Sequence, residues 1–443
     1  MRVIFILVAL IVLNSCSFDN KTGIWKNEND NQNIIKKSDI FSEFKTLTKS
    51  NSFFNETIKL NKDYDFSINK PKKNYSWNDI YYHETNNLIN FEFNNQKKII
   101  FKSKKLSRKK INEFLIFEKN FLILTDDEGN IIVYSINDNR LISKFNFYKK
   151  RYKQIKKNLN IIVKDNKVFV ADNIGYLYAY DINKDAIVWA KNYKIPFRSN
   201  LKIKEKNLIA SNQNNDLFFF DINNGNNTKL IPSEESIFKN QFRNNLALDN
   251  QTLFFINTYG TLYSIDTNSK KVNWVLNLNQ SLDINPSSLF SSTEIIKHTN
   301  KLIISSDKFT YVINSKKGII EHKKYFSSKL KPIIINNVLF SISQNNLLLA
   351  LNLDDGKIIY SYRILNKINK FKKFDENEIK LNSLMLVNNQ IYVFLNNKYI
   401  LEFNIDGNLN DILKLPNKMN SYPIIVDGSF LYINKKNKLV IFN

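Results

Sequence analysis

Cys16 is the only cysteine in the 443-residue chain, and its sulfur is the first candidate for chemistry. It ends a leader in which one basic residue, Arg2, precedes an apolar stretch from Val3 to Leu13. Such a stretch is too short to span a bilayer and is typical of a secretory signal. Because no second cysteine is available for a disulfide, the exported fold must be stable from its core alone.

The run Leu13-Asn14-Ser15-Cys16 resembles a bacterial lipobox. The resemblance implies cleavage after residue 15, a diacylglyceryl group on the Cys16 sulfur and acylation of the new amino terminus. Each buried CH₂ contributes about 0.8 kcal/mol, so several acyl chains make membrane anchoring permanent. Ser17 is not the aspartate that retains many lipoproteins in the inner membrane, so the resemblance implies the periplasmic face of the outer membrane. The alternative is an ordinary cleaved signal with a coincidental cysteine.

Other groups with catalytic or metal-binding chemistry lack the spacing that such sites need. His83, His298 and His322 are scattered, and no HExxH, Walker A, GxSxG or CxxC motif occurs. Two acidic runs, 126–129 and 354–356, lack the spaced ligands of a calcium loop and are expected to form hairpin turns. The sequence therefore predicts no catalytic residue, no metal site and no cofactor.

The net charge of +24 is spread over the whole chain rather than gathered in a stripe. A strong positive charge can mark a nucleic-acid or lipid partner. Here Lys, Asn and Ile are abundant from end to end, which indicates biased codon usage, and an exported protein meets little nucleic acid. We therefore expect no nucleic-acid partner.

The chain divides into three parts by composition. Residues 1–15 form the leader, and residues 16–74, rich in Asn, Lys and Ser, are predicted to be a flexible tether. Within the tether, apolar residues at helical spacing between 40 and 47 favour a short helix, which either packs or forms transiently. Residues 75–443 are expected to form the folded domain.

A unit of about 44 residues repeats from residue 111 onward, the length of a four-stranded propeller blade. The run from Gly175 to Trp189 matches the run from Gly260 to Trp274 without a gap. Eight units are recognised by the Asp or Asn that follows the third strand: Asn137, Asp181, Asp221, Asp266, Asn314, Asn352, Asn404 and Asn443. The predicted fold is all-β, an eight-bladed β-propeller with four antiparallel strands in each blade.

Each unit follows one plan of short apolar strands separated by turns. In the second unit we predict strands over 160–163, 168–171 and 176–180, with a fourth that ends at Trp189. The residue before the third strand is Gly or Asn in five units, because the tight hairpin there needs a positive φ. These positions are Gly175, Asn215, Gly260, Asn346 and Asn437.

The last unit supplies only three strands before the chain ends at Asn443. An open blade would expose a sheet edge, which soluble proteins avoid. The segment at about 97–103 has strand character and no blade of its own. We predict that it forms the outer strand of the eighth blade and closes the ring.

The repeats, of the form Gly-x-Leu-Tyr-Ala-x-Asp followed by Val-x-Trp, resemble those of quinoprotein-type (PQQ-like repeat) eight-bladed propellers. A lipobox before such a ring is similar to the BamB-like lipoproteins of the outer-membrane β-barrel assembly machinery. Ser76-Trp77 followed by His83 resembles a region that precedes the ring in that family. The resemblance implies a non-catalytic scaffold that binds the barrel-inserting subunit, with unfolded outer-membrane proteins as further partners.

The resemblance also implies a partner-binding loop after the blade that ends in Trp189. The matching run is 195–200, where we assign Ile195, Phe197 and Arg198 to partner binding. An arginine beside an exposed aromatic side chain is a good interface anchor. The alternative is that Phe197 packs inside the propeller and Arg198 is a solvated rim residue. The family's acidic pair in the next blade is not matched, since Asn240 and Phe242 align there.

Two other functions share this ring. One is a pyrroloquinoline-quinone dehydrogenase, although those enzymes stack the quinone between an indole and a vicinal disulfide, and this chain has no spare cysteine. Trp189 and Trp274 occupy the same outer-strand position and are expected to pack between blades. The other is a generic periplasmic propeller that binds peptide or glycan.

Overall fold

The computed structural model describes residues 16–18, 25–27, 53–148, 152–236, 242–279, 289–369 and 380–443. The chain forms two compact units, Met1–Asn51 and Ser52–Asn443. In the first unit, β1 (Cys16–Phe18) pairs antiparallel with β2 (Trp25–Asn27). The expected leader, residues 1–15, and the expected helix at 40–47 lie outside the described residues.

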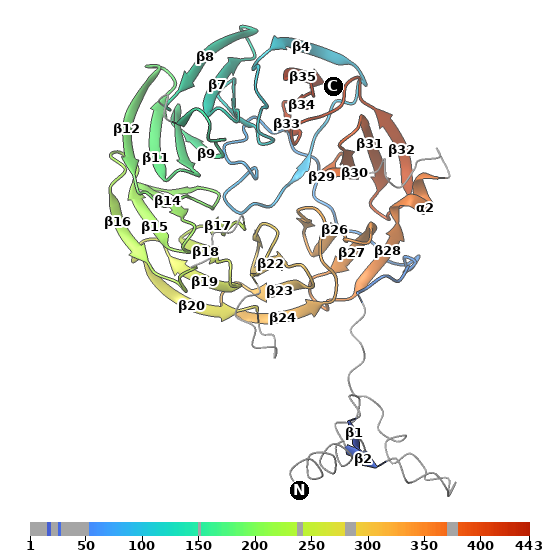
Figure 1. Cartoon of the computed structure of the whole chain (residues 1–443). Coiled ribbons are helices and arrows are strands. Elements are labelled where there is room, and N and C mark those ends of the chain that lie inside the picture. Colours follow the sequence, from blue (N-terminus) through green and yellow to red (C-terminus); the bar gives the residue numbers. More distant parts are fainter. Residues whose placement is uncertain are drawn as a thin grey trace, which may run out of the picture. The chain divides into compact units, whose positions relative to one another are not determined.

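The second unit is a ring of eight sheets, each with four antiparallel strands as the repeat predicted, and one of them gains a fifth, parallel strand (Figure 1). Each of the first four blades is built from consecutive strands: blade 1 from β5 (Ile116–Glu118), β6 (Phe121–Thr125), β7 (Asn130–Ser135) and β8 (Arg140–Asn146); blade 2 from β9 (Leu159–Lys164), β10 (Lys167–Asp172), β11 (Tyr176–Asp181) and β12 (Ala186–Asn192); blade 3 from β13 (Lys202–Lys204), β14 (Asn207–Ser211), β15 (Leu217–Asp221) and β16 (Asn227–Ile231); blade 4 from β17 (Asn245–Asp249), β18 (Thr252–Ile256), β19 (Thr261–Asp266) and β20 (Lys271–Asn277).

The next three blades continue the plan: blade 5 has β21 (Ile296–His298), β22 (Lys301–Ser305), β23 (Thr310–Asn314) and β24 (Ile319–Lys324); blade 6 has β25 (Ile333–Ile335), β26 (Val338–Ile342), β27 (Leu347–Asn352) and β28 (Ile358–Arg363); blade 7 has β29 (Leu381–Val387), β30 (Gln390–Leu395), β31 (Tyr399–Asn404) and β32 (Leu409–Lys414). A short helix, α2 (Ile364–Ile368), follows β28. No helix in the described part of the chain has the length and hydropathy of a membrane span.

Blade 8 closes the ring with a strand from upstream. Its sheet runs β33 (Ile424–Val426), β34 (Ser429–Ile433), β35 (Lys438–Phe442) and then β4 (Ile99–Lys105), which pairs antiparallel with β35. The predicted closure by residues near 97–103 is therefore confirmed. In Figure 1 the carboxyl terminus lies within the ring beside β35, where β4 covers what would otherwise be an open edge.

Turn chemistry explains why the repeats fold alike. The five predicted hairpin positions all have positive φ: Gly175 at 104°, Asn215 at 72°, Gly260 at 84°, Asn346 at 57° and Asn437 at 56°. The acidic runs are also turns, since Gly129 and Gly356 have φ of 86° and 66°. In the first run the Asp126 carboxylate accepts hydrogen bonds from the backbone amides of residues 128 and 130, which is a structural use of that carboxylate.

The two tryptophans join neighbouring blades, as expected. The indole nitrogen of Trp189 in β12 donates a hydrogen bond of 2.9 Å to the carbonyl of Ile222 in blade 3. Trp274 in β20 makes the same bond, 3.1 Å long, to the carbonyl of Ser315 in blade 5. This contact repeats because one blade's outer strand faces the turn that precedes the next blade's outer strand.

Residues 53–72, which the composition assigned to the tether, begin at the outer edge of the ring and end beside residues 74–94 inside it, where Lys72 pairs with Phe91. Phe53 stacks on Tyr325 with ring centroids 4.8 Å apart. Ile58 pairs antiparallel with Ser361 of β28, and backbone hydrogen bonds of 3.1 and 3.0 Å run in both directions. The segment thus adds extended chain to the outer edge of blade 6.

Residues 74–94, here called the inner belt, run around the inside of the ring and bind the innermost strand of every blade. The first contacts are to blades 8, 1 and 2. The Asn74 side chain donates a 2.7 Å hydrogen bond to the carbonyl of Ile425. Trp77 exchanges backbone hydrogen bonds with Phe117, and the carbonyl of Asn78 accepts one from Val163.

The belt then meets the remaining blades in chain order. Its contacts are Asp79 and Asn86 with Lys202 in blade 3, Glu84 with Leu248 in blade 4, Thr85 with Lys297 in blade 5, Asn87 with Ile334 in blade 6, β3 (Asn90–Phe91) with β29 in blade 7, and Asn94 with Gly428 in blade 8. After one circuit the chain enters β4. The belt therefore runs through the middle of the ring and links all eight blades through hydrogen bonds (Figure 1).

Candidate functional site

The predicted contact loop leads from blade 2 into blade 3 and reaches a region, here called the channel mouth, that Arg198 and Arg243 line together with Ile80 and Phe114. Phe197 is 1% exposed and packs against Phe220 in blade 3 and Tyr193 of the same loop. Its amide donates to the carbonyl of Asp172, which ties the loop to blade 2. The expectation of an exposed aromatic side chain is therefore wrong for Phe197, because the gap between the two blades buries it. Ile195 is partly buried beside it.

Arg198 is half-buried at the rim, and its guanidinium is incompletely bonded. One terminal nitrogen lies 3.5 Å from the side-chain oxygen of Gln213, which is a weak hydrogen bond. Its Nε is buried and has no hydrogen-bond partner among the described residues. Burial, followed by the nearby charge of Arg243, lowers the pKa of Arg198. The Arg198 charge thus has unmet hydrogen-bonding capacity.

Arg243 lies beside Arg198 because the two loops pair. Ser199 and Asn244 form a parallel bridge, and the amide of Asn244 donates to the Arg198 carbonyl at 3.0 Å. Burial disfavours the Arg243 charge, but Tyr81, Glu113 and Glu294 outweigh that effect, so its pKa is raised. Arg243 directly follows Phe242, which the sequence aligned with the family's acidic pair. A basic residue next to the position of the family's acidic pair was the sequence signal that could have identified Arg243 as a site residue.

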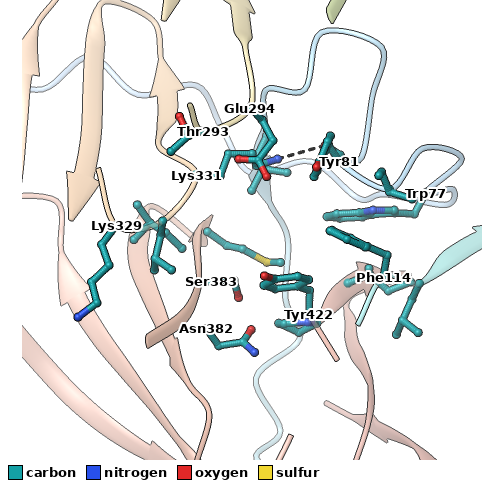
Figure 2. A pocket seen from close by; sticks show the side chains of 18 residues that line it. Trp77, Tyr81, Phe114, Thr293, Glu294, Lys329, Lys331, Asn382, Ser383 and Tyr422 are labelled. Atoms are coloured by element: carbon teal, nitrogen blue, oxygen red, sulfur yellow. Dashed lines mark hydrogen bonds between the residues drawn. The ribbon is translucent and has the colours of Figure 1, made fainter. Parts of the chain in front are cut away.

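Tyr81 of the inner belt forms the floor of the mouth. The Lys331 ammonium donates hydrogen bonds to the carbonyls of Tyr81, at 3.2 Å, and Asn86, at 2.9 Å. Burial lowers the pKa of Lys331 to about 8, although Glu294 and Asp79 oppose that shift. Figure 2 shows Tyr81, Glu294 and Lys331 gathered on one side of a cavity.

That cavity, here called the mouth cavity, has a volume of about 240 Å³. Its walls are mainly apolar, from Trp77, Leu330, Leu384, Met385 and Ile424 among others. Four polar atoms of its lining are buried and have no hydrogen-bond partner among the described residues: Trp77 Nε1, Thr293 Oγ1, Asn382 Oδ1 and Ser383 Oγ. Most buried polar groups are paired, so this concentration makes the mouth cavity a candidate binding site.

A second, basic cavity of about 430 Å³ adjoins the first, and both are lined by Ile80 and Phe114. Its lining carries five cationic side chains and one carboxylate, which are Lys110, Lys156, Lys157, Arg198, Arg243 and Glu113. The mouth therefore joins an apolar cavity to a cationic one. Such a surface can take up an apolar group and an anion together.

The other candidate residues have structural surroundings. His298 Nδ1 lies 3.4 Å from the Asn87 amide, and His322 Nε2 lies 3.0 Å from the carbonyl of Asp354. In the described ranges no group of three His, Cys, Asp or Glu side chains has the geometry of a metal site. Cys16 lies in β1 of the first unit.

A comparison with protein families matches residues 127–362, more than half of the chain, to the family of the outer membrane protein assembly factor BamB. No curated protein matches the sequence. Among solved structures, BamB from Moraxella catarrhalis is similar at a TM-score of 0.60 and 13% identity, over 78% of this chain and 99% of that chain. Quinohemoprotein alcohol dehydrogenase from Comamonas testosteroni is similar at 0.61 and 9% identity, over 84% and 81%. At such identities the likeness between structures shows the fold.

Proposed function

We propose that this chain, which belongs to the family of the outer membrane protein assembly factor BamB, is a non-catalytic scaffold for outer-membrane β-barrel assembly. In this role the ring binds the barrel-inserting subunit of the assembly complex through its channel mouth. The observation that carries the proposal is the pair of adjacent arginines, Arg198 and Arg243, on a ring held rigid by the inner belt. Rigid presentation lowers the entropy lost when a partner binds.

Within this proposal, Arg198 and Ile195 contact the partner and Phe197 positions them. Phe197 is locked between blades 2 and 3, so the loop cannot move without breaking that packing. Arg198 supplies a half-buried charge whose Nε–H has no hydrogen-bond partner among the described residues. An interface anchored by one arginine in a partly desolvated setting is a common hot-spot arrangement.

Copurification tests the proposal. The full-length chain with a carboxyl-terminal tag is expressed in its native cell, membranes are solubilised in mild detergent, and the captured proteins are identified. We expect the barrel-inserting subunit in near-stoichiometric amount. Its absence, with peptides or glycans captured in its place, would favour the generic binding propeller.

The proposal also includes a lipid anchor on Cys16 at the periplasmic face of the outer membrane. A leader of residues 1–15 and the sequence before Cys16 support it. Growth with labelled palmitate should label the wild-type chain and leave Cys16→Ser unlabelled. Equal labelling of both chains would contradict the anchor.

Unfolded outer-membrane proteins are proposed as clients that add strands to the outer edges of the blades. The pairing of Ile58 with Ser361 on β28 supports this role, because it is an outer edge that accepts extended chain. Site-specific crosslinkers on the outer strands β12 and β20 should capture nascent barrel proteins. If neither outer strand captures nascent barrel proteins while a crosslinker at Arg198 captures the barrel-inserting subunit, the client role is rejected and the scaffold role is kept.

One alternative retains support from the fold. The similarity to a quinohemoprotein alcohol dehydrogenase and the cavity beside Trp77 favour a quinone-dependent enzyme as the second candidate. Reconstitution with pyrroloquinoline quinone and calcium, followed by dye reduction with alcohols or sugars, distinguishes the two. Robust turnover would replace the scaffold proposal.

A further inference from the structure

The mouth cavity holds hydrogen-bonding groups that the protein itself does not use. Trp77 is 4% exposed and Asn382 is 8% exposed, yet Trp77 Nε1 and Asn382 Oδ1 have no partner among the described residues. Ser383 Oγ and Thr293 Oγ1 are also buried and have no hydrogen-bond partner among the described residues. The register of β29 shifts between Leu381 and Ser383, and such bulges often redirect side chains beside binding sites.

The size of the cavity sets the size of the group that fits. An apolar cavity of roughly 150 Å³ accepts benzene, and the mouth cavity measures about 240 Å³. An aromatic side chain with a polar tip therefore fits, with its ring among Leu330, Leu384 and Met385. Its polar tip can pair with Ser383 or Asn382 once one of those side chains turns toward the cavity, because Ser383 Oγ and Asn382 Oδ1 are buried. Figure 2 shows the Ser383 and Asn382 side chains on the same side of the cavity as Tyr422.

The neighbouring basic cavity favours a ligand group that carries negative charge. Arg198 and Arg243 lie side by side through the bridge of Ser199 with Asn244. After burial, the Arg243 charge is what lowers the pKa of Arg198, whereas a carboxylate between two guanidiniums forms charge-assisted hydrogen bonds with both. Phe114 lines both cavities, and the Arg243 guanidinium lies 5.8 Å from its ring. The apolar and cationic sites are thus adjacent.

We infer that the channel mouth binds an acidic segment of a protein partner, placing a carboxylate at Arg198 and Arg243 and a neighbouring aromatic side chain in the mouth cavity. This rests on the proposed function, since the partner is taken to be a protein, and it adds the chemistry of the partner segment. Successive side chains of an extended strand point to opposite faces, so the bound segment must bend where the carboxylate and the adjacent aromatic side chain enter their neighbouring cavities.

Peptides of defined sequence test the inference on the full-length chain in detergent. Three fluorescein-labelled nine-residue peptides with a Gly-Ser background carry Asp-Tyr-Asp, Asp-Ser-Asp or Lys-Tyr-Lys at the centre. We expect the Asp-Tyr-Asp peptide to bind at least about tenfold more tightly than either of the others, because it alone uses both cavities. Equal binding of the Asp-Tyr-Asp and Asp-Ser-Asp peptides would overturn the cavity assignment.

Two variants separate the two cavities. Replacing both arginines, Arg198→Gln with Arg243→Gln, should weaken the Asp-Tyr-Asp peptide about tenfold or more. Ser383→Leu fills the mouth cavity and should abolish the preference for tyrosine over serine while keeping the preference for acid. Thermal melts confirm that each variant is folded.

A matched control addresses the high net charge. Lys191→Gln with Lys229→Gln removes two positive charges from exposed positions on β12 and β16. This double variant should bind the Asp-Tyr-Asp peptide like the wild type. If it loses as much affinity as the arginine double variant, the attraction is general and the inference is rejected. Equal competition by free N-acetyltyrosine would likewise reject a protein segment as the ligand.

The barrel-inserting subunit then separates this inference from the proposed function. Its periplasmic domains are titrated with wild type and with the arginine double variant. Peptide binding without subunit binding would overturn the proposed function and keep the inference. Subunit binding that is unaffected in the arginine double variant would overturn the inference and keep the proposed function.

Discussion

The ammonium nitrogen of Lys202 lies 2.6 Å from a carboxylate oxygen of Asp79, and both side chains are almost fully buried. Lys202 begins the inner strand of blade 3, and Asp79 belongs to the inner belt, so the pair joins segments 123 residues apart. The same ammonium donates to Asn86 Oδ1 at 2.6 Å. This one lysine therefore holds both arms of the belt turn that presents Tyr81 at the channel mouth.

Lys202→Met should destabilise the protein by about 3–5 kcal/mol, because it leaves the Asp79 carboxylate buried without its partner. Urea denaturation measures the change. Adding Asp79→Asn to Lys202→Met should recover part of the loss. Lys206→Met, on the exposed turn of the same blade, serves as the control and should change stability little. A loss below 1 kcal/mol for Lys202→Met would contradict a role for the pair in holding the belt.

Deleting residues 88–104 should cause a large drop in Tm, because it removes β3 and most of β4 and leaves blade 8 open. The control is Ile100→Ser, which changes an exposed side chain of β4 and leaves the backbone pairing with β35 intact. We expect its Tm to match that of the wild type. An unchanged Tm in the deletion variant would show that the ring does not need this strand.

Gly225→Ala should destabilise the protein by about 2–4 kcal/mol, from positive-φ strain and overpacking together. Gly225 has a φ of 71°, and an added Cβ would overlap the Trp189 ring. Indole fluorescence reports the displaced ring, and chemical denaturation reports the stability. Asn223→Ala in the same turn is the control. If Gly225→Ala melts like that control, the tryptophan contact is not tightly packed.

Stability should rise with pH between about 8 and 10.5 through Lys331. Burial lowers its folded-state pKa to about 8, against 10.5 in the unfolded chain, so the unfolded state binds more protons in this window. One such proton corresponds to a slope of at most about 1.4 kcal/mol per pH unit. Lys331→Met should remove this contribution, so the free energy of unfolding of the variant should rise less with pH than that of the wild type. Parallel plots of unfolding free energy against pH for the two proteins would contradict the lowered pKa.

Arg198→Glu should weaken binding to the barrel-inserting subunit at least about tenfold, since it places a carboxylate where the proposed interface needs a cation. Isothermal titration with the subunit's periplasmic domains measures the effect. Lys191→Glu, on the exposed face of β12, changes the net charge equally and should leave affinity unchanged. Unchanged affinity for Arg198→Glu would reject its assignment to partner binding.

Much of the fold follows from local sequence. Strand and turn positions could be predicted because apolar runs and turn residues act over a few positions. In blade 2, for example, the predicted strand at 168–171 is observed as Lys167–Asp172, and Gly175 has the expected positive φ. The repeat made the number of blades a matter of counting, and the three strands of the last unit required a donor such as β4.

The candidate site depended on contacts between distant residues. The sequence predicted that Arg198 lies in the loop between blades 2 and 3, but only the packing of blade 2 on blade 3 decided that Phe197 is buried. Arg243 became a partner of Arg198 through pairing between loops 45 residues apart. The path of the inner belt could not be predicted from the sequence, because its hydrogen bonds go to eight separate blades. Local periodicity therefore determined the ring, whereas long-range packing determined which charges and cavities meet at its mouth.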